Sequence, residues 1–272
     1  FRKFSILIKI LLIFPLYIIA IIPCIIIRLV SPWFVIRIER VASVTYGRFA
    51  EDLARYYCKK KLKIDEPTKK HIDLFYIHYN DKIYNKQLAK MWKRKFNFLS
   101  GFILDPINKV NRLIPGWEIY VINSLSENNL RDPNHLIERC EKKGFKALEF
   151  TAEEEIYGKK MLKKFGLKEN DKFVCFAVRD NAYSLRKSNY PNHDWSYHDY
   201  RNHDIDKFRL VAEELTRRGY YIFRMGVVAN KPMKTNNPKI IDYVNTDLRN
   251  DFLDVYLGAK CSFCLSTGTG FH

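Results

Sequence analysis

The hexapeptide FVCFAV, at residues 173–178, carries no polar side chain on either face of the strand that it predicts. Strands of this kind lie inside parallel sheets whose two faces are both covered by helices. An amphipathic pattern follows over residues 205–219, and a further strand is predicted over 220–226. A strand, a helix and a strand in this order predict a parallel α/β unit.

The same alternation extends over most of the chain. We expect further strands at 33–41, 71–80, 116–124, 239–244 and 261–266, and further helices at 49–63, 85–99, 132–144, 151–166 and 250–259. The helix at 151–166 has a threonine cap, early glutamates and a terminal glycine, which are typical helix boundaries. The pattern predicts two α/β domains, an N-terminal one over residues 33–150 and a C-terminal one over 151–272, facing a cleft.

An uncharged stretch, ILLIFPLYIIAIIPCIII, occupies residues 10–27. As a helix it would be about 27 Å long, just short of the hydrocarbon core of a bilayer. Pro15 and Pro23 each remove a helical hydrogen bond and bend such a helix. We expect residues 1–32 to form a hydrophobic membrane anchor, and leave open whether it is a transmembrane helix or a re-entrant or in-plane segment. Arginines and the CKKKLK cluster follow it, so the positive-inside rule places the globular part in the cytoplasm.

The formal net charge is +17, and the excess is concentrated near the anchor. Residues 1–100 contain 20 basic and 7 acidic side chains, which gives 20 − 7 = +13. A basic region beside an apolar segment favours an anionic membrane surface as a partner, and a solvated basic face is the alternative. We expect no nucleic-acid partner, because zinc-finger spacing, an RNP-type strand and a basic zipper are all absent.

Neither the cysteines nor the acidic pairs predict a metal site. Six scattered cysteines are typical of reduced, buried thiols, and the pair Cys261 and Cys264 has no second pair to complete four zinc ligands. Asp204 and Asp206 have the Asp-x-Asp form of some metal sites. They also begin a predicted helix, where an N-cap and a first-turn carboxylate explain them. We adopt the capping interpretation.

Polar residues follow three predicted strands of the C-terminal half, at the sheet edge where ligands bind in parallel sheets. Arg179 and Asp180 follow the first strand, Arg224 and Gly226 end the second, and the third leads into Ser266, Thr267, Gly268 and Thr269. Arginine forks and a glycine turn together suit a diphosphate. The alternatives are an ordinary tight turn and an ion pair between Arg224 and Asp242. The Walker and GxGxxG patterns are absent, which disfavours kinase and dehydrogenase chemistry.

A long polar loop over 179–203 is rich in aromatic, histidine and aspartate residues. Long loops without regular structure are usually functional or disordered, and the aromatic content argues for function. His198 and Asp199, or Asp194, are candidates for a general base acting on a hydroxyl. A hydrogen bond that orders the loop is the alternative role for each histidine.

The motifs YHDYRN, FRMG and STGTG, within residues 172–270, resemble a family of bacterial glycosyltransferases from surface-polysaccharide biosynthesis loci. The resemblance implies a GT-B-like fold of two Rossmann-like domains, with a nucleotide sugar on the second domain and the acceptor on the first. It also implies that no metal or other cofactor is needed. The expected donor-binding residues are Arg179, Asp180, Arg201, Asn202, Arg224, Gly226, Ser266, Thr267, Gly268 and Thr269. The family continues past STGTG, so we expect a chain truncated at both ends.

The leading hypothesis is therefore a membrane-associated glycosyltransferase of the bacterial inner membrane. It would move a sugar from a nucleotide-diphosphate donor to a lipid-linked or surface-polysaccharide acceptor, with Arg179 and Arg224 neutralising the diphosphate and His198 and Asp199 acting on the acceptor hydroxyl. Two alternatives remain open. One is a non-catalytic, membrane-anchored scaffold of a polysaccharide assembly complex, and the other is a sugar-nucleotide epimerase on the same fold.

Overall fold

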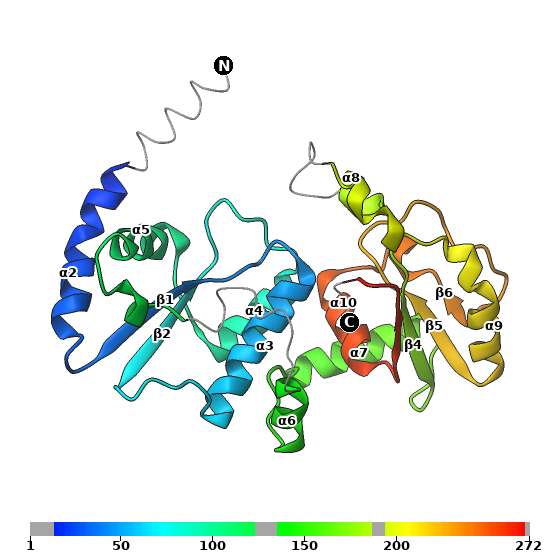
Figure 1. Cartoon of the computed structure of the whole chain (residues 1–272). Coiled ribbons are helices and arrows are strands. Elements are labelled where there is room, and N and C mark those ends of the chain that lie inside the picture. Colours follow the sequence, from blue (N-terminus) through cyan, green and yellow to red (C-terminus); the bar gives the residue numbers. More distant parts are fainter. Residues whose placement is uncertain (1–13, 123–134, 187–193, 270–272) are drawn as a thin grey trace. The chain divides into compact units, whose positions relative to one another are not determined.

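The computed structural model describes residues 14–122, 135–186 and 194–269, which form two compact units (Figure 1). The described part of the first unit consists of residues 14–43, 48–83, 90–122 and 135–148. The second unit contains most of the C-terminal half, from Glu149 onward, and two short segments from earlier in the chain, Val44–Gly47 and Tyr84–Ala89. The chain is thus a mixed α/β protein in which each unit has its own parallel sheet.

The sheet of the first unit has the order β1 (Val35–Arg40), β2 (His71–Tyr76), β3 (Asn97–Phe98), and all its pairs are parallel. Helix α3 (Tyr46–Leu62) connects the first two strands, and α4 (Lys86–Lys95) connects the next two. The predicted strands at 33–41 and 71–80 are confirmed with shorter bounds. The predicted helix at 85–99 ends early, because residues 97 and 98 pair with β2.

A buried ion pair joins the two long strands of this sheet. Arg37 Nε and Nη2 lie 2.6 and 2.8 Å from the two carboxylate oxygens of Asp73, and Tyr56 of α3 donates to the same carboxylate. Burial acts to raise the pKa of Asp73, but the hydrogen bonds from Arg37 and Tyr56 outweigh it and lower the pKa. The charge is therefore compensated within the core.

Two elements of the first unit differ from the sequence predictions. The strand expected at 116–124 is wrong: Gly116 adopts φ 76° and is followed by the 3-10 helix η1 (Trp117–Tyr120). Residues 123 and 124 lie outside the described part. Helix α5 (Gly101–Arg112) was not predicted, since it contains Pro106, which the sequence pattern treats as a helix breaker.

Helix α2 (Ile21–Val30) carries part of the predicted anchor and packs against α5. Cys24 and Ile27 of α2, and Ala20 directly before it, are buried with Leu104 and Ile107. No helix within the described residues is long and apolar enough to cross a membrane. Residues 1–13 of the predicted anchor, which include the first four residues of the uncharged stretch, lie outside the described part.

The second unit has a parallel sheet of order β6 (Ile240–Ile241), β5 (Tyr220–Arg224), β4 (Lys172–Ala177), β7 (Cys264–Ser266). Alternate residues of β4 enter two different clusters. Phe173 and Cys175 pack with α7 (Ala152–Lys164) and α10 (Asp251–Lys260), while Val174 and Phe176 pack with α9 (Arg209–Arg217). The sequence prediction of a strand covered on both faces is confirmed.

Helix boundaries in this unit follow the predicted caps. Thr151 and Glu154 form a reciprocal capping box at the start of α7. Asp204 accepts a hydrogen bond from the backbone N–H of Asp206, which confirms the capping interpretation, although the first turn is the 3-10 helix η3 (Ile205–Phe208). The long loop also contains α8 (Ala182–Arg186) and the 3-10 helix η2 (Ser196–Arg201), and α6 (Leu136–Lys142) precedes this unit in the chain.

The start of α5 depends on the absence of a side chain at Gly101. A Cβ atom there would lie 2.2 Å from the backbone oxygen of Ile77. We expect Gly101→Ala to lower the free energy of unfolding by about 1–3 kcal/mol, because backbone atoms must shift. Urea denaturation of this variant beside Lys163→Ala, an exposed change on α7, measures the effect. Equal stabilities of the two variants would contradict the prediction.

Candidate functional site

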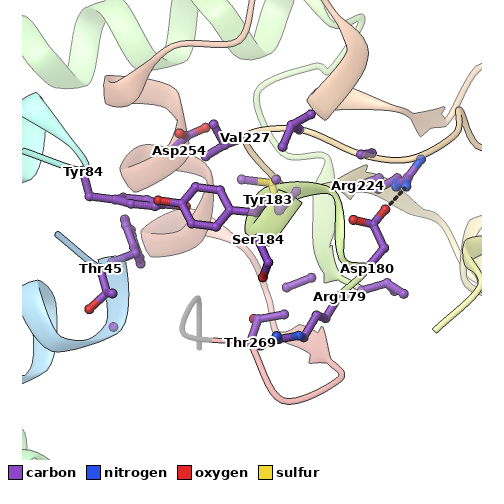
Figure 2. Close-up of a pocket in the computed structure, with 18 residues that line it drawn as sticks. Thr45, Tyr84, Arg179, Asp180, Tyr183, Ser184, Arg224, Val227, Asp254 and Thr269 are labelled. Atoms are coloured by element: carbon purple, nitrogen blue, oxygen red, sulfur yellow. Dashed lines mark ion pairs between the residues drawn. The ribbon is translucent and has the colours of Figure 1, made fainter. Parts of the chain in front are cut away.

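A cavity of about 280 Å³ lies at the carboxyl edge of the sheet in the second unit (Figure 2). Its walls are formed by the residues that follow β4 and β5, by Thr269 beyond β7, and by the two early segments that belong to this unit. The carboxyl edge of a parallel sheet is where ligands bind in folds of this class. The sequence-predicted residues that line the cavity are Arg179, Asp180, Arg224, Gly226 and Thr269.

The other predicted donor-binding residues lie around Arg179 and are not among those that line the cavity. The backbone N–H of Arg179 donates to Thr267 Oγ1 at 2.8 Å, and its Nε donates to Asn202 Oδ1 at 3.2 Å. Arg201 donates through Nη2 to the carbonyl of Gly268. The polar loop and the glycine turn therefore meet at the end of β4. The sequence analysis expected Arg179 and the glycine turn to share this edge, and did not predict the contact of Arg201 with Gly268.

Two guanidinium groups are close enough in this place to affect each other. Burial, and next the positive charge of Arg201, lower the pKa of Arg179, while Asp199 offsets part of that effect. Neither the carbonyl of Gly268 nor the amide of Asn202 neutralises a positive charge. An anion bound beside the two arginines would relieve their repulsion and accept charge-assisted hydrogen bonds.

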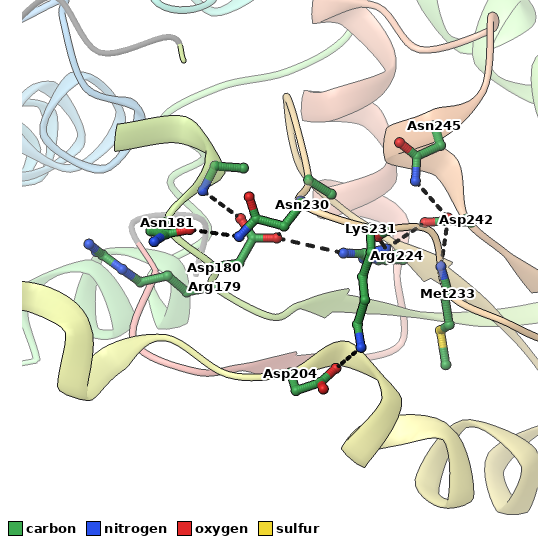
Figure 3. Close-up of polar contacts among 12 residues, drawn as sticks. Arg179, Asp180, Asn181, Asp204, Arg224, Asn230, Lys231, Met233, Asp242 and Asn245 are labelled. Atoms are coloured by element: carbon green, nitrogen blue, oxygen red, sulfur yellow. Dashed lines mark hydrogen bonds and ion pairs between the residues drawn. The ribbon is translucent and has the colours of Figure 1, made fainter. Parts of the chain in front are cut away.

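Arg224 is 2% exposed and its guanidinium group is held by several partners (Figure 3). Nη1 lies 2.7 Å from the carbonyl oxygen of Lys231 and 3.2 Å from Asp242 Oδ1, and Nη2 lies 3.9 Å from Asp180 Oδ2. The ion pair with Asp242, which the sequence left open as an alternative, is present. The side chain of Lys231 in turn pairs with Asp204, at 2.7 Å.

Asp180 organises the loops on either side of the cavity. Its two carboxylate oxygens accept hydrogen bonds from the backbone N–H groups of Ala182 and Asn230, each at 2.9 Å. Gly226, at φ 153°, begins the segment that leads to Asn230, and a Cβ atom there would lie 3.2 Å from Val244 Cγ2. Its carbonyl accepts a hydrogen bond from Arg249 Nε at 3.0 Å. The wall after β5 is thus fixed at both ends.

Three tyrosines of the site were not predicted. The ring centroids of Tyr46 and Tyr84 are 5.8 Å apart, and those of Tyr84 and Tyr183 are 5.5 Å apart. Burial raises the pKa of all three, so their hydroxyl groups stay protonated near neutral pH. Neighbouring aromatic rings in a cavity offer a surface for a planar base or a sugar ring. The three tyrosines are far apart in the sequence and belong to no motif, so the sequence did not indicate that they share a cavity.

Asp254, in the first turn of α10, also lines the cavity and was not predicted. Its carboxylate accepts hydrogen bonds from Tyr243 Oη at 3.0 Å and from Arg249 Nη2 at 2.5 Å. Burial raises the pKa of Asp254 to about 6, against the opposing effect of Arg249. A carboxyl group with such a pKa changes its charge in the range where many enzymes work.

The predicted base candidates His198 and Asp199 lie on η2. Asp199 Oδ1 accepts a hydrogen bond from Asn202 Nδ2 at 2.8 Å, and the rings of His198 and Tyr197 are 4.0 Å apart. These contacts order the loop locally. Asn202 links Asp199 to Arg179, so η2 is connected to one wall of the cavity. In the described part of the chain, no three His, Cys, Asp or Glu side chains are placed to hold a metal ion.

A scan against models of known protein families and searches of curated proteins and of solved structures gave no match to this chain.

Replacing Arg224 tests whether its ion pairs hold the strand ends together. We expect Arg224→Met to lower the free energy of unfolding by about 3–5 kcal/mol, because it leaves Asp242 and the Lys231 carbonyl without their shared donor. Arg217→Met, which removes an exposed ion pair on α9, is the matched control and should change it by less than about 1 kcal/mol. Urea denaturation of both variants decides, and a similar loss in both would contradict a structural role for Arg224.

The raised pKa of Asp254 predicts a pH-dependent stability. Its ordinary value is 3.8, so between about pH 4 and 6 the folded state binds more protons than the unfolded state. Wild-type stability should therefore fall, relative to Asp254→Asn, as the pH rises through this range, by at most about 3 kcal/mol. Melting temperatures from pH 4 to pH 8 measure this. The exposed Asp247→Asn is the control, and parallel curves for Asp254→Asn and wild type would contradict the shift.

Proposed function

We propose that this chain is a glycosyltransferase that binds a nucleotide-diphosphate sugar in the cavity of the second unit. The observation that carries the proposal is the position of Arg179. It lies at the cavity wall, at the carboxyl edge of a parallel sheet, with a second guanidinium group from Arg201 close to it. Among the described residues, neither guanidinium group forms an ion pair with a carboxylate. A diphosphate is the ligand whose charge and geometry fit two arginine forks beside a glycine turn.

The cavity also offers groups that could contact the remainder of such a donor. The tyrosines Tyr46, Tyr84 and Tyr183 offer ring faces and protonated hydroxyl groups for the base or the sugar. Backbone groups of the segment that begins at Gly226 line the same cavity. The proposal also takes up the resemblance of YHDYRN, FRMG and STGTG to bacterial glycosyltransferases, since Arg201, Arg224 and Gly268 each belong to one of these motifs. A GT-B-like arrangement of the two units is part of the proposal.

In the proposed reaction the bond between the anomeric carbon of the sugar and the β-phosphate oxygen breaks. The nucleoside diphosphate leaves with the electron pair, and Arg179 and Arg201 neutralise its additional negative charge. A new bond forms between the anomeric carbon and a hydroxyl oxygen of a lipid-linked or surface-polysaccharide acceptor. His198 or Asp199 receives the hydroxyl proton, as a general base must. No metal takes part in this scheme, and the proposed location is the cytoplasmic side of a bacterial inner membrane.

Nucleotide binding is the first test. We expect one of UDP, GDP or dTDP to raise the melting temperature of the full-length protein, because a ligand selective for the folded state stabilises it. Arg179→Gln should weaken that ligand by roughly 10- to 100-fold, the value of a charged hydrogen bond. Arg209→Gln, which removes an exposed arginine on α9, is the matched control and should bind like the wild type.

Three results would overturn parts of the proposal. If no nucleotide shifts the melting temperature of the wild-type protein, the diphosphate site is wrong. If a nucleotide binds but no sugar donor is consumed with any acceptor lipid or polysaccharide, the non-catalytic scaffold is favoured. If the sugar is converted without an acceptor, an epimerase is favoured.

A further inference from the structure

Helix α2 has two apolar faces, and the described part of the chain covers only one of them. Ala20, Cys24 and Ile27 are buried against α5, and Cys24 Sγ donates a hydrogen bond to the carbonyl of Ile107 at 3.2 Å. The opposite face is apolar as well and is exposed to between 46% and 67%. It consists of Ile21, Ile22, Ile25, Ile26 and Leu29, and the helical turns before α2 add Phe14, Ile18 and Ile19. A face of this size on a surface helix indicates an interaction site.

The helix is fixed to the first unit at its C-terminal end. Arg28 donates to Asn111 Oδ1 at 2.9 Å, to the carbonyl of Pro115 at 2.9 Å and to that of Ile114 at 3.0 Å. The guanidinium group also lies 5.1 Å from the ring of Tyr120. If α2 separated from the unit to cross a bilayer alone, the hydrogen bonds of Arg28 and the packing of Ala20, Cys24 and Ile27 against α5 would be lost. The exposed face is therefore presented by a helix that stays on the unit.

Helix α5 continues the apolar surface. It lies beside α2 in Figure 1, and its first turn exposes Phe102 to 56% and Ile103 to 60%. Leu99, directly before α5, is also exposed, and the ring of Tyr79 stacks on Phe102 at 4.6 Å. Two neighbouring helices thus present exposed apolar side chains, whereas the sequence analysis predicted a membrane contact for residues 1–32 only.

Basic and aromatic groups lie at both ends of this surface. Beyond the C-terminal end of α2, Trp33 is 76% exposed, and Lys69 Nζ lies 3.4 Å from the carbonyl oxygen of Ser31. Toward the other end, Lys109 Nζ lies 3.2 Å from Tyr17 Oη and forms an ion pair with the buried Asp105, at 2.8 Å. Tryptophan, tyrosine and lysine at the borders of an apolar face are typical of groups at the headgroup level of a bilayer, and lysines favour anionic lipids.

We infer that the outward face of α2, together with Leu99, Phe102 and Ile103, is a membrane-docking surface that lies in the plane of one leaflet of an anionic bilayer. A second copy of the chain fits this surface less well, because a symmetric contact would bring the lysines of both copies together. The inference does not depend on glycosyl transfer. It concerns how the first unit binds a membrane. Of the arrangements that the sequence left open, it favours the in-plane one for α2.

Vesicle flotation tests the inference. The full-length protein is diluted from detergent into vesicles of phosphatidylcholine alone or of phosphatidylcholine with phosphatidylglycerol, and floated in a density gradient. We expect binding that is stronger with phosphatidylglycerol and weaker at high salt. The triple variant Ile22→Gln, Ile25→Gln, Leu29→Gln should reduce the bound fraction by about tenfold or more, since three apolar side chains no longer enter the bilayer.

A second variant separates this surface from a helix that crosses the membrane. The double variant Phe102→Ser, Ile103→Ser should also weaken binding severalfold, which a spanning anchor with α5 outside the bilayer would not show. The matched control is Leu210→Gln, Val211→Gln, an exposed apolar pair on α9, and it should float like the wild type. All changed side chains are exposed, so the melting temperatures should stay close to that of the wild type.

Three outcomes would overturn the inference. The first is a wild-type protein that does not float with anionic vesicles. The second is a Phe102 and Ile103 variant that floats like the wild type. The third is a dimer, seen by light scattering, that the α2 variant converts to a monomer without any change in vesicle binding. Nucleotide-induced thermal shifts of the same variants show separately whether the donor site is intact, so the failure of one proposal does not imply failure of the other.

Discussion

The buried guanidinium group of Arg224 sets the arrangement of the second unit. A cation with 2% of its surface exposed is tolerated only when its partners compensate for the lost water. Those partners are Asp180 after β4, Asp242 after β6 and the carbonyl of Lys231, so the ends of three neighbouring strands are coupled to one charge. The carboxylate of Asp180 also accepts hydrogen bonds from the backbone N–H groups of Ala182 and Asn230. The shape of the cavity therefore follows from the requirement to neutralise one arginine.

Much of this arrangement could be predicted from the sequence, because strand ends in a parallel sheet share one edge. The apolar hexapeptide of β4 required cover on both faces, and the two clusters on either side of the sheet provide it. The meeting of Arg179 with Thr267 follows from the pairing of β4 with β7. In each case the prediction needed only the side-chain period of a strand and the direction of its neighbours.

The remainder depends on contacts between distant segments. Tyr46, Tyr84 and Tyr183 share a cavity only after folding, and a lone tyrosine in a sequence does not indicate one. An acidic residue in the first turn of a helix, such as Asp254, is common. Its hydrogen bonds from Tyr243 and Arg249 form only when the chain folds. Helix α5 was missed for a local reason, since Pro106 is accommodated by packing that the sequence pattern does not express.

The bonds of Arg28 to residues 111–115 have a consequence for how the first unit can be divided. A segment that the sequence predicts as a membrane anchor also covers part of the core. Without α2, the side chains of Leu104 and Ile107 would be uncovered, and the end of α5 would lose the hydrogen bonds that Arg28 donates. The same helix thus carries much of the proposed docking surface and part of the core of the first unit. Deleting α2 to improve the solubility of the protein would remove its exposed apolar face, but it would expose the apolar side chains of α5 that α2 covers.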